Sequence, residues 1–319
     1  IMEAKKEIIR NHPSDAMEFI SEGVSEDQIG GLDLLLEWVK KKARPPEKKE
    51  LWKRRNVKPP KGLLLLGPPG CGKSLTAKAV SGMLKVPMIR FDVAKVYGSY
   101  VGQSETTLNT CLKLAEAVSP CVLWMDEIEK ALAGTSSGGG GSGDGGVGTR
   151  VFGQILTWMN EKKEDVFIVA TANNIQTIID NSPELLRRGR FDEIFYIEYP
   201  NKNSREKIFD IHLRNCATNY ETGELMTEFV DLDTFDTGEL AELTEHWTGA
   251  EIEDVVTSAN EEAVLMGEEN PLTQDIIKRL IDATKPDFER LQAGDPESSS
   301  LQKMAELGKS IGKLATSPE

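Results

Sequence analysis

The sequence predicts an α/β domain, in which a parallel β-sheet lies between two layers of helices, followed by a small all-α domain. Two observations support this prediction. Up to about residue 200, short apolar runs such as Cys121–Met125 recur between amphipathic segments, a pattern typical of parallel strands that are buried on both faces. After Pro200 the strand pattern stops, and the remaining apolar periodicity is helical.

Composition limits the possible classes of function. The chain has 319 residues, enough for two domains, and contains no apolar run near 18 residues and no secretory leader, so neither a membrane span nor export is expected. Its net charge of −14 disfavours nucleic acid as a partner, because affinity for phosphate backbones is built from Lys and Arg. Four cysteines without C-x-x-C spacing favour a reduced, cytoplasmic setting. Because the sequence begins with Ile1, we expect an N-terminally trimmed chain.

The N-terminal residues 1–27 are mostly polar, and we interpret them as a linker or extension. A helix is predicted next, because four apolar residues recur at helical spacing and form one stripe: Leu32, Leu35, Leu36 and Val39. The basic run at residues 40–42 suits the C-terminal end of that helix, where cations are favoured.

A glycine-rich loop at residues 67–74 has the spacing G-x-x-x-x-G-K-[ST], between an apolar run at 63–66 and a helix-compatible segment at 75–84. The glycines let backbone N–H groups turn inward around phosphates, and the helix N-terminus adds partial positive charge. Lys73 would reach the β and γ phosphates, and the Ser74 hydroxyl would ligate a bridging Mg²⁺. The alternative is a turn with a chance Lys-Ser pair, which the flanking strand and helix disfavour.

Polar side chains follow two later strands. The run 121–125 ends in Asp126 and Glu127, where an open α/β sheet places its ligand crevice. Asp126 could hold Mg²⁺ through water, and Glu127 could orient or deprotonate an attacking water. The strand predicted at 166–170 leads to Asn173, whose carboxamide could position water or sense the γ-phosphate. A solvated strand end is the alternative for the carboxylates.

Three loops have unusual composition. Residues 97–105 are rich in glycine and aromatics, and taken alone Tyr100 and Val101 are more often core-edge residues than a functional loop. Residues 134–148 are glycine-rich and predict a mobile segment, either a linker or a loop that orders on substrate. Arginines at 187, 188 and 190 exceed what solubility requires, and such groups often serve phosphate transfer from another subunit. Ordinary surface salt bridges are the alternative.

Helical periodicity and capping signals predict the remaining elements. A capping box at Thr248 and Glu251 should begin one of four helices in the all-α domain. These four helices are predicted at residues 203–213, 238–246, 251–266 and 273–284. Further helices are predicted at residues 106–118, 149–162 and 301–314, and the final strand at residues 194–197. The predicted organisation is a sheet domain at 28–200, a helical domain at 201–285 and a C-terminal tail with a short helix at 286–319.

Taken together, these motifs resemble the AAA+ ATPase superfamily, and its classical AAA branch in particular. Residues 122–132, with the sequence VLWMDEIEKAL, are similar to the little-characterised AAA proteins of cyanobacteria and plastids. The resemblance implies a P-loop αβα sandwich with strand order 5-1-4-3-2, a C-terminal helical lid and assembly into a ring, usually of six.

The resemblance also implies roles for individual residues. Those around the nucleotide would be Ile29, Gly31, Pro69, Gly70, Cys71, Gly72, Lys73, Ser74, Leu75, His212, Gly249 and Ala250. Catalysis would use Glu127 and Asn173 beside Lys73, with Arg187 and Arg190 as arginine fingers for a neighbouring site, and Mg²⁺ would be held by Ser74 and Asp126. Tyr100 and Val101 match the first pore loop, which reverses their interpretation in favour of function, and residues 134–148 fall at the second.

These observations predict Mg²⁺-dependent ATP hydrolysis by a homo-hexameric ring that remodels or threads an unidentified protein client. The alternative from another class is a slowly hydrolysing, ATP-gated assembly or scaffold that threads nothing. Remodelling of DNA or RNA is disfavoured by the charge of −14. The expected location is cytoplasmic, or the plastid stroma if the chain is plastid-derived.

Overall fold

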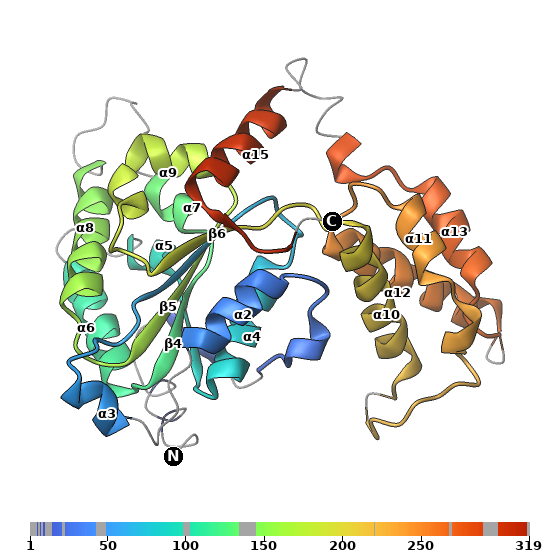
Figure 1. Cartoon of the computed structure of the whole chain (residues 1–319), viewed down its shortest axis with the longest axis horizontal. Coiled ribbons are helices and arrows are strands. Elements are labelled where there is room, and N and C mark those ends of the chain that lie inside the picture. The colour runs from blue at the N-terminus through green and yellow to red at the C-terminus, as the bar shows by residue number, and fades with distance from the viewer. Residues whose placement is uncertain are drawn as a thin grey trace.

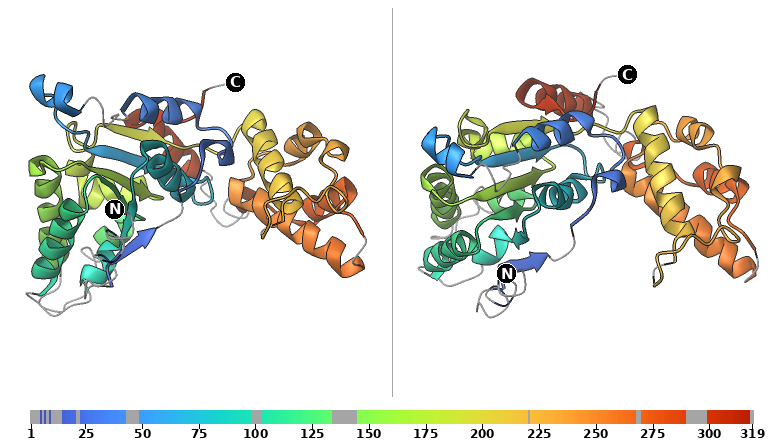
Figure 2. Two further views of the ribbon diagram at one scale, coloured as in Figure 1. Left: turned by 90° about the horizontal axis from the view of Figure 1, so that it is seen from below. Right: turned by 60° about the horizontal axis from the view of Figure 1, so that its bottom comes forward.

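The computed structural model describes residues 5, 7, 9, 15–20, 23–42, 49–97, 103–133, 145–219, 221–267, 270–289 and 299–317. A sheet domain comes first, and a bundle of helices follows it on one side (Figure 1). The two additional views show the same separation between the sheet domain and these helices (Figure 2).

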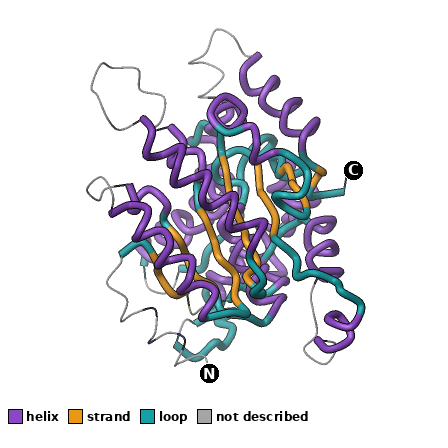
Figure 3. Tube along the Cα trace, turned by 90° about the vertical axis from the view of Figure 1, so that its left-hand side faces the viewer, coloured by secondary structure: helices purple, strands orange, loops and turns teal. Residues whose placement is uncertain are grey.

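A seven-stranded sheet forms the centre of the first domain, in the order β1-β3-β4-β5-β2-β6-β7. All neighbouring pairs are parallel except β1 with β3. The central strands β3-β4-β5-β2-β6, read from the opposite edge, have the predicted order 5-1-4-3-2, so this prediction is confirmed. Figure 3 shows the strands with helices around them. Their bounds are Met17–Ile20 (β1), Gly62–Leu66 (β2), Met88–Phe91 (β3), Cys121–Met125 (β4), Val166–Ala172 (β5), Glu193–Tyr196 (β6) and Lys313–Leu314 (β7).

Helices cover both faces of this sheet, which explains why its strands lack alternation. Leu64 and Leu66 of β2 face a core shared with α6 and α8, whereas Leu63 and Leu65 face a second core shared with α2 and α4. The helices and 3-10 turns of this domain are η1 (Glu26–Gln28), α2 (Asp33–Lys42), α3 (Lys49–Arg54), α4 (Lys73–Leu84), α5 (Val93–Tyr97), α6 (Gln103–Ala117), α7 (Ile128–Ala133), α8 (Gly145–Glu161), α9 (Ile175–Asn181) and η3 (Pro183–Leu186).

The helical part has its own apolar core, built around Phe209, Trp247 and Val256. The predicted capping box is present: the Thr248 hydroxyl accepts the N–H of Glu251, whose carboxylate accepts the N–H of Thr248. Its elements are α10 (Lys202–Ala217), η4 (Leu232–Thr234), α11 (Thr237–Leu243), α12 (Gly249–Met266) and α13 (Gln274–Ala283). The predicted fold class, an α/β domain followed by a C-terminal helical part, is therefore confirmed.

Both ends of the described chain depart from the sequence prediction. Residues 17–20, interpreted as part of a linker, instead form β1, which pairs with β3 at the sheet edge. The helix predicted at 301–314 is α15 (Ser299–Ile311), and Lys313–Leu314 then forms β7 beside β6. Strands this short are stabilised by pairing with an existing sheet edge, so the sequence gives little local signal for them.

Two predicted loops lie largely outside the described residues. Tyr100 and Val101 belong to the segment 98–102, which the structure does not describe. The same holds for residues 134–144 of the glycine-rich segment, whereas residues 145–148 begin α8. The assignment of both segments as pore loops stays a prediction.

Candidate functional site

The phosphate-type loop connects β2 to α4 as predicted, and glycine is required at two of its positions. At Gly67, with φ 152°, an added Cβ would lie 2.2 Å from the carbonyl oxygen of Ile197. Gly72 has φ 79° and is the N-cap of α4, and a Cβ there would meet nothing within 4 Å. The first glycine permits close packing, and the second provides a left-handed turn that opens the helix N-terminus to a ligand.

Lys73 lies at the first position of α4 and is 6% exposed. Its ammonium group donates to the carbonyl oxygens of Gly67 and Pro68, at 2.9 and 2.5 Å. Burial lowers the pKa of Lys73, while Asp126, Glu127 and other anionic groups oppose this decrease. The loop therefore holds a buried cation beside the two carboxylates predicted from the sequence.

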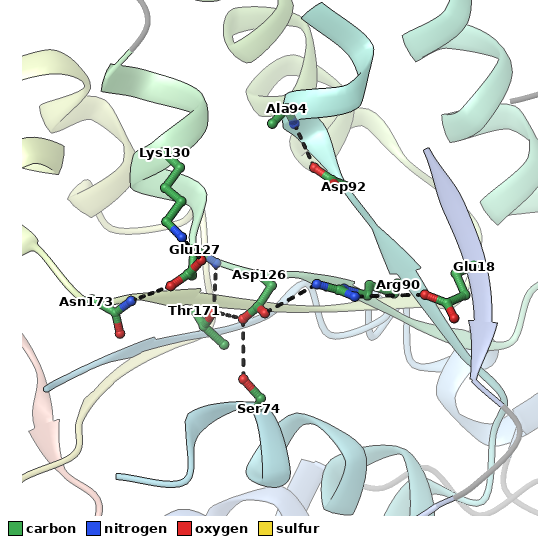
Figure 4. A network of polar contacts seen from close by, with 10 residues as sticks. All are labelled: Glu18, Ser74, Arg90, Asp92, Ala94, Asp126, Glu127, Lys130, Thr171 and Asn173. Carbon is green, nitrogen blue, oxygen red and sulfur yellow. Dashed lines mark hydrogen bonds and ion pairs between the residues drawn. The ribbon is translucent and has the colours of Figure 1, made fainter. Parts of the chain in front are cut away.

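Asp126 is at the centre of a polar network at the end of β4 (Figure 4). Its Oδ1 accepts a hydrogen bond from the Thr171 hydroxyl at 2.6 Å and lies 3.4 Å from the Ser74 hydroxyl. Its Oδ2 lies 3.9 Å from the guanidinium group of Arg90 on β3. Residues of β3, β5 and the first turn of α4 therefore meet at the carboxylate of Asp126.

Glu127 adopts a left-handed backbone conformation, with φ 48°, which non-glycine residues rarely adopt outside special sites. Its N–H donates to Thr171 Oγ1 at 2.9 Å, and its carboxylate accepts from Asn173 Nδ2 at 2.8 Å. Lys130 forms an ion pair with the same carboxylate. The backbone of Glu127 is thus anchored to the tip of β5, with its side chain next to Asn173.

Sequence reasoning missed three residues of this network. Thr171 is fully buried and connects Asp126 with Glu127, and a polar residue inside the apolar run of β5 was the available signal. Glu129 is buried and accepts the N–H of Asn173 at 2.9 Å, and burial raises its pKa. Arg90 lies over the ring of Trp124 and reaches Asp126 from the neighbouring strand, a pairing that only the sheet register reveals.

A cavity of about 490 Å³ lies beside this network, between the sheet and the helical part. Most predicted nucleotide-site residues line it: Ile29, Pro69, Gly70, Cys71, Gly72, Lys73, Ser74, Leu75, Asp126, Glu127, Asn173, His212, Gly249 and Ala250. Gly31 is not among its lining residues, and an added Cβ there would lie 2.5 Å from the hydroxyl of Ser204 on α10. Lining residues that were not predicted include Ile208, Glu253 and Thr316.

The two predicted arginine fingers do not line this cavity. Arg187 is exposed, in the turn that follows η3. Arg190 is half-buried, and its guanidinium group donates to the carbonyl oxygen of Leu156 at 3.1 Å. Within the described chain, neither guanidinium is therefore part of the site formed by its own phosphate loop.

Two further lining residues have perturbed titration. Burial raises the pKa of the Cys71 thiol to about 12, so the thiol stays protonated at neutral pH. Burial also lowers the pKa of His212, while Glu253 opposes that decrease. Both side chains are therefore neutral in the cavity at pH 7, where they can pack against an uncharged part of a ligand.

The described residues contain no helix long and apolar enough to cross a membrane. They also contain no group of three or more His, Cys, Asp or Glu side chains that could hold a metal ion.

A glycine loop at a helix N-terminus, with two carboxylates on the adjacent strand end of a parallel sheet, defines a P-loop α/β domain. Residues 63–199 match the model of the ATPase family associated with various cellular activities (AAA), and the chain therefore contains an AAA domain.

Relatives of two kinds are similar to this chain. A protein of Pyropia yezoensis named "Uncharacterized AAA domain-containing protein ycf46" is 39% identical over 297 residues, which cover 92% of this chain and 56% of that protein. The "Cell division cycle protein 48 homolog" of Archaeoglobus fulgidus is 37% identical over 81% of this chain and 33% of its own length. The "Proteasome-activating nucleotidase" of Methanococcus vannielii is 34% identical over 80% of this chain and 59% of its length. The chain spans about half the length of the ycf46 proteins that it matches.

Proposed function

We propose that this chain hydrolyses ATP with Mg²⁺ in a homo-oligomeric ring, a hexamer in the simplest case, and uses hydrolysis to remodel or thread a protein client. The observation that carries the proposal is the network of Figure 4. Beside the phosphate loop, the side-chain carboxylates of Asp126 and Glu127 have different hydrogen-bond partners: Thr171 and Ser74 for Asp126, and Asn173 for Glu127.

The residues at the loop fit Mg²⁺ and a triphosphate. Ser74 and Asp126 present hydroxyl and carboxylate oxygens only 3.4 Å apart, the donor types that Mg²⁺ prefers, and would hold the ion there. Bound Mg²⁺ would supply positive charge to neutralise the phosphates. Lys73 adds a second positive charge at the same loop.

Two side chains have separate roles in the hydrolytic step. Glu127 accepts the proton of the attacking water, and Asn173, bound to its carboxylate at 2.8 Å, fixes the orientation of that carboxylate. The left-handed backbone of Glu127 supports this assignment, because such conformations persist where the surrounding structure enforces them and are frequent at active sites.

The arginines support a shared site. Arg187 is exposed and does not line the cavity of its own chain, which leaves its guanidinium group available to a neighbouring subunit. Similarity to a protein named proteasome-activating nucleotidase supports a protein as the client. We also propose a cytoplasmic location, or the plastid stroma for a plastid-derived chain.

Mixing two inactive variants tests the shared site. Glu127→Gln cannot activate water but still offers its arginines, whereas Arg187→Ala keeps an intact loop but offers no Arg187 guanidinium to its neighbour. Each variant alone should lose most ATPase activity, and an equimolar mixture should recover a measurable part of it. Arg188→Ala, an exposed neighbouring arginine, is the matched control and should behave like the wild type.

Recovery in the mixture requires that one subunit contributes its Arg187 to the nucleotide site of its neighbour. If the mixture stays as inactive as its components, while the wild-type rate per chain does not rise with protein concentration, the shared-site ring is wrong. If Tyr100→Ala leaves client processing intact while Glu127→Gln abolishes it, the ring acts without threading, which favours the ATP-gated assembly.

A further inference from the structure

The C-terminal end of the described chain, residues 312–317, is built into the sheet domain, and we call this segment the C-terminal strap. Leu314 lies opposite Tyr196 in the parallel pairing of β7 with β6, and the N–H of Ala315 donates to the carbonyl oxygen of Tyr196 at 3.2 Å. Ala315 is 1% exposed and belongs to the core shared with α2 and α4. In Figure 1 the chain leaves α15 beside β6 and ends between the sheet domain and the helical bundle.

Helix α15 fixes where the strap begins. An added Cβ at Gly308 would lie 2.3 Å from ring atoms of Tyr196, and one at Gly312 would lie 3.0 Å from the Tyr196 backbone nitrogen. These two glycines, one helical turn apart, therefore let α15 approach β6 closely. Lys309 also forms an ion pair with Glu198, at 2.6 Å.

The opposite side of the strap holds the segment that enters α2. The N–H of Leu35 donates to the carbonyl oxygen of Ala315 at 3.1 Å, and the N–H of Leu32 donates to the Thr316 hydroxyl at 3.3 Å. The N–H of Ser317 donates to Asp33 Oδ1 at 3.1 Å, and its hydroxyl bonds the other carboxylate oxygen. The strap thus connects the sheet edge to the Ile29–Leu32 segment of the cavity wall.

Thr316 lines the cavity beside the part of its wall that precedes α2, where its hydroxyl contacts Leu32 and would lie 3.8 Å from a Cβ added at Gly31. The cavity wall includes the apolar residues Ile29, Leu32 and, from α10, Ile208 and Ile211. An apolar pocket with a few polar groups suits a nucleoside base. Because the Thr316 oxygen accepts the N–H of Leu32, its own hydrogen can be donated to an acceptor in the cavity.

From these contacts we infer that the C-terminal strap is part of the nucleotide site, and that the Thr316 hydroxyl donates a hydrogen bond to the base of the bound nucleotide. Ser317 acts through Asp33 as a positioning residue, because it holds Thr316 against the cavity without lining it. This inference rests on the proposed function, since it names a contact within the same site.

Calorimetric titration of the full chain with ADP, and separately with inorganic tripolyphosphate, tests the inference. Thr316→Val should weaken ADP binding about 2- to 12-fold, the loss of one hydrogen bond, whereas Thr316→Ser should stay within about twofold of the wild type. Ser317→Ala should weaken ADP binding about 2- to 5-fold through the strap. Thr227→Val, an exposed threonine of the helical part, is the matched control.

Tripolyphosphate separates the base end from the phosphate end. Its affinity should be unchanged in every variant, because it occupies the phosphate loop alone. The inference is overturned if Thr316→Val binds ADP as the wild type does, or if it weakens ADP and tripolyphosphate equally, which would indicate a general structural effect. Wild-type protein that binds no ADP at all would instead overturn the proposed function, and this inference with it.

Discussion

The Thr171→Val substitution tests whether one buried hydroxyl holds both carboxylates of the site in place. Thr171 is fully buried, donates to Asp126 Oδ1 at 2.6 Å and accepts the N–H of Glu127 at 2.9 Å. Valine has nearly the same shape but can make neither hydrogen bond. The substitution therefore removes the connection between the strand ends without opening a large cavity.

The expected loss of stability follows from the two groups that lose their partner. A buried polar group left unpaired costs about 1–3 kcal/mol. The Asp126 side chain is 23% exposed, so water replaces part of its lost bond and the total should lie near the lower end, about 2 kcal/mol. For a chain of this size that corresponds to a melting temperature about 3 °C lower.

The effect on hydrolysis should be larger than the effect on binding. General-base catalysis contributes about 10²–10⁴ in rate, and misplacement of Glu127 should forfeit part of it, about 10- to 100-fold in turnover. ADP affinity should change by less than about threefold, because Thr171 bonds Asp126 and Glu127, for which roles in hydrolysis are proposed. Thr171→Ser keeps the hydroxyl and is the control.

The assay compares ATP turnover at saturation, ADP affinity and thermal unfolding for the wild type, Thr171→Val and Thr171→Ser. A folded Thr171→Val protein with wild-type turnover would refute the reasoning, because it would show that the carboxylates keep their positions without this hydroxyl. A parallel fall in turnover and in ADP affinity would refute it differently, as evidence of a collapsed site.

Three further predictions follow from burial. Gly308→Ala should destabilise the chain by about 1–2 kcal/mol, because its Cβ would lie 2.3 Å from the ring of the buried Tyr196. Gly153→Ala in α8 should be neutral or stabilising, because a Cβ there would meet open space. Chemical denaturation measures the free energy of unfolding of both variants. Cys71, with its pKa raised to about 12 by burial, should react with iodoacetamide at pH 8 at least about 100-fold more slowly than an unfolded cysteine, as mass spectrometry of its peptide would show. Because burial lowers the pKa of His212, its contribution to stability is complete above the ordinary value of 6.5 and is lost as the pH falls through the lower native pKa. Thermal unfolding between pH 7.5 and 5 should therefore depend less on pH in His212→Gln.

Each of these predictions has a contradicting result. Equal stability of the two alanine variants would show that α15 does not pack against β6 as described. Rapid stoichiometric alkylation of Cys71 in the folded chain would mean that the thiol is accessible or ionised. An unchanged pH dependence in His212→Gln would mean that the imidazole titrates alike in the folded and unfolded chain.

Several features of the site were predictable because their signal is local. The phosphate loop, the carboxylates at the end of β4 and Asn173 at the tip of β5 each follow an apolar run directly, and parallel strands bring such ends to one edge. The capping box at the start of α12 was predictable for the same reason, since its two residues are three apart.

The rest depended on contacts between residues distant in sequence. Thr171 and Arg90 contact Asp126 because β3, β4 and β5 are neighbours in register, which no local pattern specifies. Short edge strands such as β1 are equally hidden, since a strand of four residues is stable only where a sheet edge is present to pair with it.

By itself, the sequence determined the class of the fold, the order of its central strands through the family resemblance, and most of the residues around the cavity. These follow from periodicity and motif spacing, which act over a few residues. Only the tertiary structure decided that the C-terminal strap would join the sheet and bring Thr316 to the cavity, 284 residues from Leu32 in the sequence. The physical reason is that the strap has no stability of its own. It can form its hydrogen bonds only after β6 and α2 have folded and lie on either side of it.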